Sequence, residues 1–499
     1  MREKSRSVGL WGEGVGGALA IVGLSPLVLV FFGEAIAALT LEAGFLSTPE
    51  GLHFYSAYRV GKFFELYSGE RLFKAPLSAC PYMPVYPLAF GLLQRLFGPT
   101  PIWGRALSFV SALWGAFMIL RLVEGCGGGR KFGALGAMIW LSSPSVMDWG
   151  VACTEDVMGV SLEATALLFG LKGRGWAAGA FLLLAVLTRP TTALCGAAAL
   201  PFMGREGRRA TAVGLAGAVL VAGAMGILTG GGFFRHLGLL SLPLWGARQI
   251  AVLAASLRAS PALGRWGAIS PSMPGLWGLF ALLALSWGIS RRAPKWLKVY
   301  LLAGFSVGIL TSQRLGASTD YFLHFVVACS VGSAIALAGL IKGGGLGRLA
   351  PGLVVLVGAW DASTWGGAYL SAFPPAWNEG ARVVIKEAVR LLKEEGGPVV
   401  SVDPSIPVRA GRESLVNEPW TFSVMALYKG WDWEHFEEVA SRAIAVVASA
   451  PGVPSQECYP PQWREFILRL RRGWRRVRIG PEGSPYEVEV LLRPLRARL

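Results

Sequence analysis

The sequence predicts a polytopic α-helical membrane protein with a small C-terminal α/β domain outside the membrane. Three observations carry this prediction. The chain is 53% hydrophobic and only 16% charged, with a mean hydropathy of +0.50, and soluble domains carry more charge than this. Many apolar runs approach or exceed the ~20 residues that cross a bilayer. Beyond about residue 372 these runs give way to amphipathic helix and strand patterns.

About eleven spans are expected. The first is an apolar run from about 14 to 32 that follows the basic start MREKSR. Because this run is long and no convincing cleavage site follows it, an uncleaved helix fits better than a cleaved signal peptide. The other spans are expected at residues 105–124, 132–149, 156–171, 175–188, 190–203, 210–229, 272–289, 297–312, 321–341 and 349–367.

Short basic loops indicate the orientation. Segments such as GCGGGRKF, GREGRR and SRRAPKWLK would all lie on the same side as the N-terminus, and the positive-inside rule places that side in the cytoplasm. We therefore predict a multi-pass protein of the cytoplasmic membrane, with residues 1–371 embedded among membrane lipids and the domain 372–499 extracytoplasmic. These loops also explain much of the net charge of +16 without nucleic acid.

The polar segment 34–101 is expected outside the membrane. Its part from Glu50 to Pro87 combines an acid beside a glycine with many aromatic residues and several cations. A connector of this length without obvious regular structure is usually functional or disordered, and this one is too aromatic for disorder. We interpret it as the roof of an active site. Residues 86–98 are apolar but short and are expected to form a helix at the interface, and a second outer loop, 230–270, would form a mobile flap or interfacial helices.

The C-terminal domain has its own pattern. Residues 377–396 show helical periodicity, with Gly396 as a stop signal. Strands are expected at 398–403, 443–449 and 486–494. The basic and aromatic stretch 469–478 fits either a solvated helix face or a contact with anionic lipid.

Acids and arginines at the outer ends of spans are the candidate functional residues. They are Glu50, Asp148, Glu155, Asp156, Arg189, Arg314 and Asp320. Charged groups near the apolar layer are costly, so they are usually either paired or functional. Structural roles stay open as well, because Asp156 would complement a helix N-terminus and Arg189 would snorkel to the interface. For Asp148, Cys153, His53 and His324 a structural role is the simpler interpretation.

Together these groups suit a group transfer at the membrane surface. A carboxylate would deprotonate an acceptor hydroxyl or amine, and arginines would bind a lipid phosphate as it leaves. Aromatic residues would stack on a sugar or pack along an isoprenoid. The candidate substrate-binding residues are His53, Tyr55, Lys62, Tyr82, Tyr86, Asp320 and Tyr321. The sequence has no Walker motif or other nucleotide fingerprint, which favours a lipid-borne donor.

Several motifs resemble one known family. PEGLHFYSAYRVGKFFELY, PYMPVYPLAFGLLQRLFG and GRALSFVSALWG resemble the first luminal loop and second span of bacterial GT-C superfamily glycosyltransferases. The branch that contains protein mannosyltransferases and aminoarabinose transferases is the most similar. TEDVMGVSLEATALL, LTRPTTAL and GASTDYFLH resemble later motifs of that branch, in the same order, so the resemblance covers most of the chain.

The resemblance implies inverting transfer of a sugar from a polyprenyl-phosphate donor to a lipid, glycan or protein acceptor on the outer face of the membrane. By matching motifs, Glu50 would be the catalytic base and Asp156 a second catalytic acid, while Arg189 would bind the donor phosphate. The chain departs from the pattern at Glu50, where many members have Asp, and at Asp320 and His324, where Asn and Glu are common.

Other interpretations stay open at this point. A secondary transporter or lipid flippase would also have many spans, and a catalytically inactive relative would bind a lipid-linked sugar without transferring it. The sequence identifies no particular cofactor, and a divalent metal stays open. The six cysteines lack metal-ligand spacing, and Cys80 and Cys153 would both lie outside the membrane, which leaves a disulfide between them open.

Overall fold

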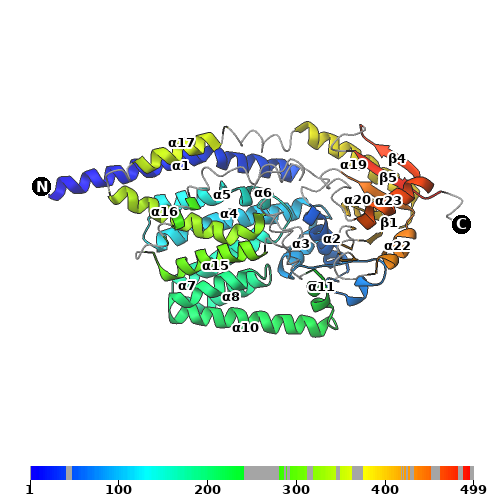
Figure 1. Ribbon diagram of the computed structural model, residues 1–499, viewed down its shortest axis with the longest axis horizontal. Helices are drawn as coiled ribbons and strands as arrows, with labels where there is room; N and C mark the ends of the chain where they lie inside the picture. Colours follow the sequence, from blue (N-terminus) through cyan, green and yellow to red (C-terminus); the bar gives the residue numbers. More distant parts are fainter. Residues whose placement is uncertain are drawn as a thin grey trace.

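The computed structural model places a helical bundle towards the N-terminus and a sheet with covering helices towards the C-terminus (Figure 1). It describes residues 2–40, 48–63, 65–240, 293–311, 319–343, 349–361, 375–416, 432–450, 461–481 and 487–494, with isolated positions at 280–288, 363 and 419–426. Arg314 lies outside the described residues, as do most of the expected span 272–289 and residues 241–270 of the segment expected to form a second outer loop.

The bundle is built from helices that follow the apolar runs. They are α1 (Arg2–Thr40), α4 (Ile102–Gly125), α5 (Arg130–Leu141), α6 (Pro144–Trp149), α7 (Asp156–Leu171), α8 (Gly175–Val186), α9 (Thr192–Ala199), α10 (Arg205–Leu228), α15 (Lys295–Thr311), α16 (Leu323–Gly343) and α17 (Ala350–Asp361). Among the described residues, four segments are long and apolar enough to cross a membrane: Val15–Thr40, Ile102–Gly125, Arg205–Leu228 and Asp320–Gly343. The total of eleven spans stays a prediction.

Two expected spans are interrupted. The run 132–149 breaks into α5 and α6, because the Ser143 hydroxyl accepts a hydrogen bond from the Val146 N–H and Pro144 starts a new helix. The run 190–203 ends in a 3₁₀ turn, Leu200–Met203, that contains a proline. In both runs a proline at the start of a new helical segment interrupts the helix, and apolar composition alone does not predict such a break.

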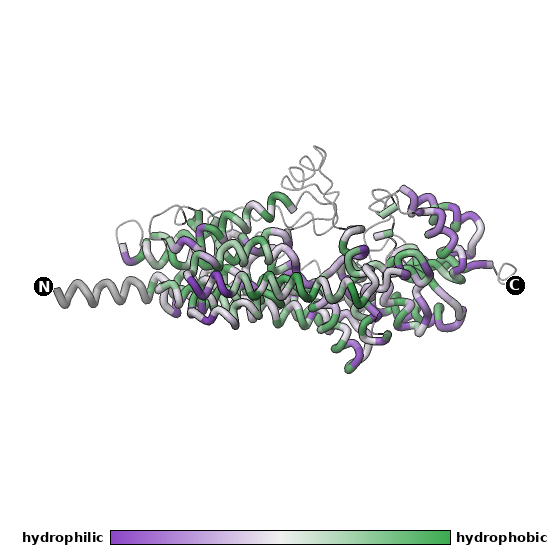
Figure 2. The backbone as a smooth tube through the Cα atoms, turned by 90° about the horizontal axis from the view of Figure 1, so that it is seen from below, coloured by the Kyte–Doolittle hydropathy of each residue, from purple (hydrophilic) through white to green (hydrophobic). Residues whose placement is uncertain are grey.

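Close helix packing and an apolar outer surface both fit a membrane environment. A Cβ on Gly115 of α4 would come within 2.5 Å of the Ser161 hydroxyl of α7, and such small residues let membrane helices approach closely. On α10, the side chains of Ile227 and Leu228 are more than 80% exposed, as expected for residues that face lipid. Figure 2 shows hydrophobic stretches concentrated in the bundle and hydrophilic ones towards the C-terminus.

The segment 34–101, which we expect outside the membrane and call the first outer segment, is helical rather than irregular. It contains α2 (Thr48–Phe63), the 3₁₀ helix η1 (Gly69–Leu72) and α3 (Val85–Phe97). Helices α2 and α3 pack closely because Gly61 lies against the Gly91 carbonyl, where a Cβ would come within 2.6 Å. Leu88, Leu92 and Leu96 form one exposed face of α3, and this pattern fits the interfacial helix expected at 86–98.

The C-terminal region is a five-stranded sheet of order β2-β1-β3-β5-β4. The strands are β1 (Val399–Ser401), β2 (Ser414–Val416), β3 (Ala445–Ser449), β4 (Arg475–Ile479) and β5 (Val488–Leu492), and the helices are α19 (Pro375–Glu395), α20 (Ser405–Arg409), α22 (Trp433–Ser441) and α23 (Pro461–Gly473). Strands β2, β1 and β3 are parallel, whereas β5 runs antiparallel to β3 and β4. The expected helix and three strands are present.

The basic stretch 469–478 is not one helix face, because it divides between α23 and β4. Several of its arginines form ion pairs: Arg469 with Glu437, Arg471 and Arg476 with Glu489, and Arg475 with Glu395. These pairs explain part of the basic composition within the protein itself. A contact with anionic lipid stays a prediction.

The sheet region rests directly on the first outer segment. The Leu77 N–H donates to the Leu415 carbonyl at 2.7 Å, and the Tyr55 hydroxyl donates to the Ser414 carbonyl at 3.2 Å. Val408 of α20 packs in the same apolar cluster as Phe54 and Tyr55 of α2. Residues that lie more than 300 positions apart in the chain therefore form one end of the molecule.

Candidate active site

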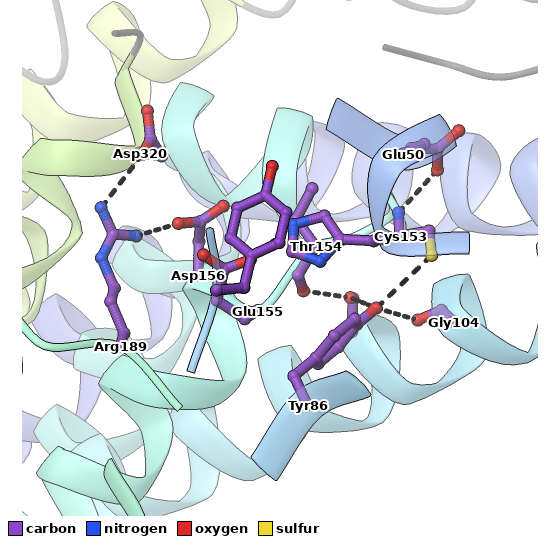
Figure 3. Close-up of polar contacts among 12 residues, drawn as sticks. Glu50, Tyr86, Gly104, Cys153, Thr154, Glu155, Asp156, Arg189 and Asp320 are labelled. Atoms are coloured by element: carbon purple, nitrogen blue, oxygen red, sulfur yellow. Dashed lines mark hydrogen bonds and ion pairs between the residues drawn. The ribbon is translucent and has the colours of Figure 1, made fainter. Parts of the chain in front are cut away.

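Arg189 is the centre of a buried charged cluster between the bundle helices. It follows α8 in the turn that leads to α9, and only 3% of its surface is exposed. One terminal nitrogen forms an ion pair with Asp156, the first residue of α7, and the other lies 3.0 Å from Asp320 Oδ2. The Nε–H donates to the Thr191 hydroxyl at 2.9 Å, and the guanidinium lies 5.1 Å from the centre of the Tyr321 ring. Three segments distant in sequence therefore meet at this arginine (Figure 3).

A second pair lies beside this cluster, at residue 155. Glu155 Oε2 lies 2.6 Å from His53 Nε2, and the His53 ring stacks on Tyr82 with centroids 3.7 Å apart. Burial acts to raise the pKa of Glu155, but His53 and Arg189 outweigh it and hold that pKa below its usual value. Glu155 is therefore ionised at neutral pH. Its side chain is 12% exposed, more than that of Asp156 at 10%.

Glu50 belongs to a different, fully buried ion pair. Its two oxygens accept hydrogen bonds from Arg105 Nη2 at 2.9 Å and Arg105 Nε at 3.1 Å. The Cys153 N–H also donates to Glu50 at 2.6 Å, and Arg105 Nη1 donates to the Ala38 carbonyl at 3.0 Å. Both side chains are completely buried. Residues 153–156 separate Glu50 from Arg189, as Figure 3 shows.

The structure thus divides the predicted site residues. Asp156, Arg189, Asp320 and Tyr321 meet in one cluster, and His53 and Tyr82 adjoin it through Glu155. The others lie outside the Arg189 cluster, although the Tyr86 ring packs edge-on against His53. Tyr55 bonds to the C-terminal region and Lys62 donates to the Tyr58 hydroxyl on an exposed surface, while the Tyr86 hydroxyl lies 3.0 Å from the Gly104 carbonyl.

The sequence analysis does not predict a role for Arg105, although an arginine inside an apolar run is itself a sign of a buried acid partner. It names Glu155 beside Asp156 as a candidate, but it does not predict that the two adjacent side chains have different partners. The two cysteines considered for a disulfide, Cys80 and Cys153, are both free and buried.

A second group of buried side chains offers possible metal ligands. One atom each of Glu163, Cys195 and His324 lies within 4.8 Å of the others. However, His324 Nδ1 is only 2.6 Å from Glu163 Oε2, and two ligands of a tetrahedral zinc, each about 2.0–2.1 Å from the metal, would be about 3.3 Å apart. The spacing therefore fits a hydrogen bond better than a shared metal ion.

Comparisons with known proteins show similarity in fold. No protein-family model matches the sequence, and no curated protein matches it. Among solved structures, ArnT from Cupriavidus metallidurans bound to undecaprenyl phosphate aligns with a TM-score of 0.59 and 13% identity, over 93% of this chain and 97% of that one. The apo form of ArnT aligns with a TM-score of 0.55 and 13% identity, over 93% and 97% of the two chains.

A third solved structure also aligns over most of this chain. The archaeal oligosaccharyltransferase AglB from Archaeoglobus fulgidus, in complex with an inhibitory peptide and a dolichol-phosphate, gives a TM-score of 0.50 and 12% identity. That alignment covers 95% of this chain and 74% of AglB. Since bundle, outer segment and C-terminal sheet region are all included in these alignments, the fold of this chain is GT-C-like, similar to that of ArnT and AglB.

Proposed function

We propose that this protein is an integral membrane glycosyltransferase. It transfers a sugar, with inversion, from a polyprenyl-phosphate donor to a lipid, glycan or protein acceptor on the outer face of the cytoplasmic membrane. The Arg189 cluster is the observation that carries the proposal, because it places a buried guanidinium and three acidic residues side by side. The GT-C-like fold supports it, since ArnT was solved with undecaprenyl phosphate and AglB with a dolichol-phosphate.

Arg189 is suited to bind the donor phosphate. A guanidinium has five N–H groups, and the contacts with Thr191, Asp156 and Asp320 use three of them. One N–H on each terminal nitrogen is left over by these contacts. Two such groups match the oxygens of a phosphate in a bidentate arrangement and would stabilise it as the leaving group. Arg314 stays a second proposed phosphate ligand.

Glu155 is our choice for the general base. It is ionised, partly exposed and adjacent to Arg189, whereas Glu50 is completely buried with both oxygens bonded to Arg105. In the proposed step Glu155 accepts the proton of the acceptor hydroxyl or amine. The acceptor lone pair forms the new bond to the anomeric carbon, and the carbon–oxygen bond to phosphate breaks. The electron pair leaves with the polyprenyl phosphate, which Arg189 holds.

The proposal also gives roles to the neighbouring residues. Asp156 and Asp320 pair with Arg189 before the donor binds and compete with its phosphate, and His53 orients the Glu155 carboxylate. Tyr82, which stacks on His53, and Tyr321, which lies beside Arg189, would contact the sugar. The base assigned from the motif resemblance, Glu50, would then have a structural role, which the stability experiment in the Discussion tests.

The test uses the full-length protein in lipid nanodiscs. Purified protein is incubated with a panel of polyprenyl-phosphate sugars and candidate acceptors, and release of the free polyprenyl phosphate is measured. We expect release by the wild type, at least a hundredfold loss in Glu155→Gln, which is within the usual contribution of a general base of roughly 10²–10⁴, and weaker donor binding in Arg189→Ala. Wild-type turnover in Glu155→Gln would reject Glu155 as base, and absence of any release and of polyprenyl phosphate binding by the wild type would reject the function.

A further inference from the structure

A chain of hydrogen bonds leads from Arg189 into the interior of the bundle. Arg189 Nε donates to the Thr191 hydroxyl at 2.9 Å, and that hydroxyl lies 3.1 Å from His324 Nε2. The other ring nitrogen, Nδ1, lies 2.6 Å from Glu163 Oε2, and the Tyr300 hydroxyl donates to the same carboxylate oxygen at 2.8 Å. Glu163, Thr191, Tyr300 and His324 come from α7, the start of α9, α15 and α16, so the chain joins four helices.

The hydrogen-bond donors along this chain are consistent with one arrangement. Since Thr191 accepts the Arg189 N–H, its single hydroxyl proton is free to be donated to His324 Nε2. His324 then carries a proton on Nδ1 and donates it to Glu163, as a carboxylate fixes the tautomer of a histidine elsewhere. Every ring nitrogen and the Thr191 hydroxyl have a partner in this arrangement.

The Thr191 hydroxyl bonds to Arg189 and His324 instead of capping helix α9. It occupies the N-cap position of α9, where a threonine side chain ordinarily accepts a hydrogen bond from a backbone N–H of the first turn. Here the Thr191 side chain makes no such capping bond, and its hydroxyl bonds to Arg189 and His324 instead. The side chain therefore serves the arginine rather than the helix.

The end of this hydrogen-bond chain that lies away from Arg189 is tightly packed. Glu163, Tyr300 and His324 are completely buried. A Cβ on Gly196 of α9 would come within 2.8 Å of Glu163 Oε1, so the carboxylate fills the space that this glycine leaves. A charged or strongly polar group this deep in an apolar bundle is costly, so it is retained where it is paired or functional.

We propose that Thr191, His324 and Glu163 are positioning residues that hold Arg189 in the orientation needed to bind the donor phosphate. This inference rests on the proposed function. It assigns no contact with substrate to the three residues. Their effect reaches the donor only through the Arg189 guanidinium, whose two remaining N–H groups are aimed by the bond at Nε.

The test compares substitutions that differ by one hydroxyl. Thr191→Val removes the hydroxyl and keeps the shape, whereas Thr191→Ser keeps the hydroxyl. The matched control is Thr165→Val on α7, because Thr165 is also a buried threonine with a hydroxyl partner, Trp114 Nε1 at 2.9 Å, but the chain described above does not include it. The measurements are the KM for donor and acceptor, kcat, and the Kd for undecaprenyl phosphate, all with full-length protein in nanodiscs.

We expect Thr191→Val to raise the donor KM and the undecaprenyl phosphate Kd about tenfold, the scale of one lost hydrogen bond to a charged group. The acceptor KM should stay within about twofold, and Thr191→Ser and Thr165→Val should bind the donor like the wild type. His324→Leu should repeat the effect of Thr191→Val, and the two together should not add fully because they act in one chain.

Two results would overturn the inference while leaving the proposed function intact. One is an unchanged donor KM and Kd in Thr191→Val, and the other is an equal loss in Thr191→Val and Thr191→Ser, which would show that shape rather than the hydroxyl matters. If the wild type itself neither binds undecaprenyl phosphate nor releases it from any donor, the proposed function fails first and the inference fails with it.

Discussion

Replacing Glu50 by glutamine separates a structural role from a catalytic one. In the folded protein, Glu50 and Arg105 are both completely buried and joined by two hydrogen bonds of 2.9 and 3.1 Å. Glutamine keeps an oxygen for the Cys153 N–H but removes the negative charge, which leaves the Arg105 guanidinium buried without its counter-charge. Breaking one side of a buried pair in this way costs about 3–5 kcal/mol.

The magnitude is large enough to measure directly. A loss of about 3–5 kcal/mol lowers the ratio of folded to unfolded protein by roughly 10²- to 10⁴-fold. Equilibrium unfolding by SDS titration in mixed micelles, followed by tryptophan fluorescence, reports this change. The double variant Glu50→Gln/Arg105→Met serves as the control, because removing both charges of a buried pair is often nearly neutral. We expect it to recover most of the stability that Glu50→Gln loses.

The same variant decides between two candidate bases. If Glu50→Gln unfolds like the wild type and yet has no transferase activity, the buried pair is not a structural requirement and Glu50 returns as the base. If Glu50→Gln is destabilised while its folded fraction still turns over, the base lies elsewhere, as we propose for Glu155. The activity of each variant is therefore divided by its folded fraction, which is measured by size-exclusion chromatography under the assay conditions.

Three further predictions concern the remaining charged groups. Asp320→Asn should tighten undecaprenyl phosphate binding severalfold, because it removes a carboxyl group that competes with the phosphate for Arg189; weaker binding in a titration would show that Asp320 instead supports the phosphate site. Burial lowers the pKa of His236, whose ring accepts a hydrogen bond from the Cys80 N–H at 3.0 Å. The buried, neutral ring therefore contributes its full stability above the unfolded pKa of about 6.5, and this contribution is lost as the pH falls through the lower folded pKa. The protection factors of residues 232–240, which are hydrogen-exchange rates corrected for the intrinsic pH dependence of exchange, should therefore be lower at pH 5.5 than at pH 7.5, and equal protection factors would contradict the reasoning. Burial raises the pKa of Asp403 to about 6, against the opposing hydrogen bonds from Ser405, so the stability it contributes is complete below an unfolded pKa of about 3.9 and is lost as the pH rises through about 6. Asp403→Asn should thus gain up to about 3 kcal/mol over the wild type at pH 7.5 and little at pH 4; a variant that is less stable at pH 7.5 would exclude this.

Local patterns in the sequence predict the helices and most strands, but not the pairing of charges. Apolar runs and amphipathic periodicity are properties of neighbouring residues, and so the helices over 102–125 and 375–395 follow from them. Breaks inside apolar runs depend on single residues such as Ser143 and are missed by an average over composition. Strand β2 is only three residues long and was not expected, because its pairing with β1 and the contact of Leu77 with this strand depend on the tertiary fold.

The partners of the buried arginines also depend on the tertiary fold, so neighbouring residues in the sequence do not predict them. Arg105 lies 55 positions from Glu50, and Arg189 lies 131 positions from Asp320. Any of the acids at the outer ends of the spans was an equally good partner until helix packing fixed their positions. Glu155 and Asp156 are adjacent in sequence, but Glu155 precedes α7 and Asp156 is its first residue. The Glu155 side chain therefore reaches His53, and the Asp156 side chain reaches Arg189.

The two buried arginines differ in how completely their acidic partners are buried, and this difference bears on function. Arg105 is completely buried, its acid is completely buried, and its third contact is a backbone carbonyl. Arg189 has two acids whose side chains are 10% and 12% exposed. An ion pair in which both side chains are completely buried is closed to a ligand, so breaking it costs stability. An arginine whose acidic partners are partly exposed is open to an incoming anion, so removing it should weaken donor binding more than it weakens the fold.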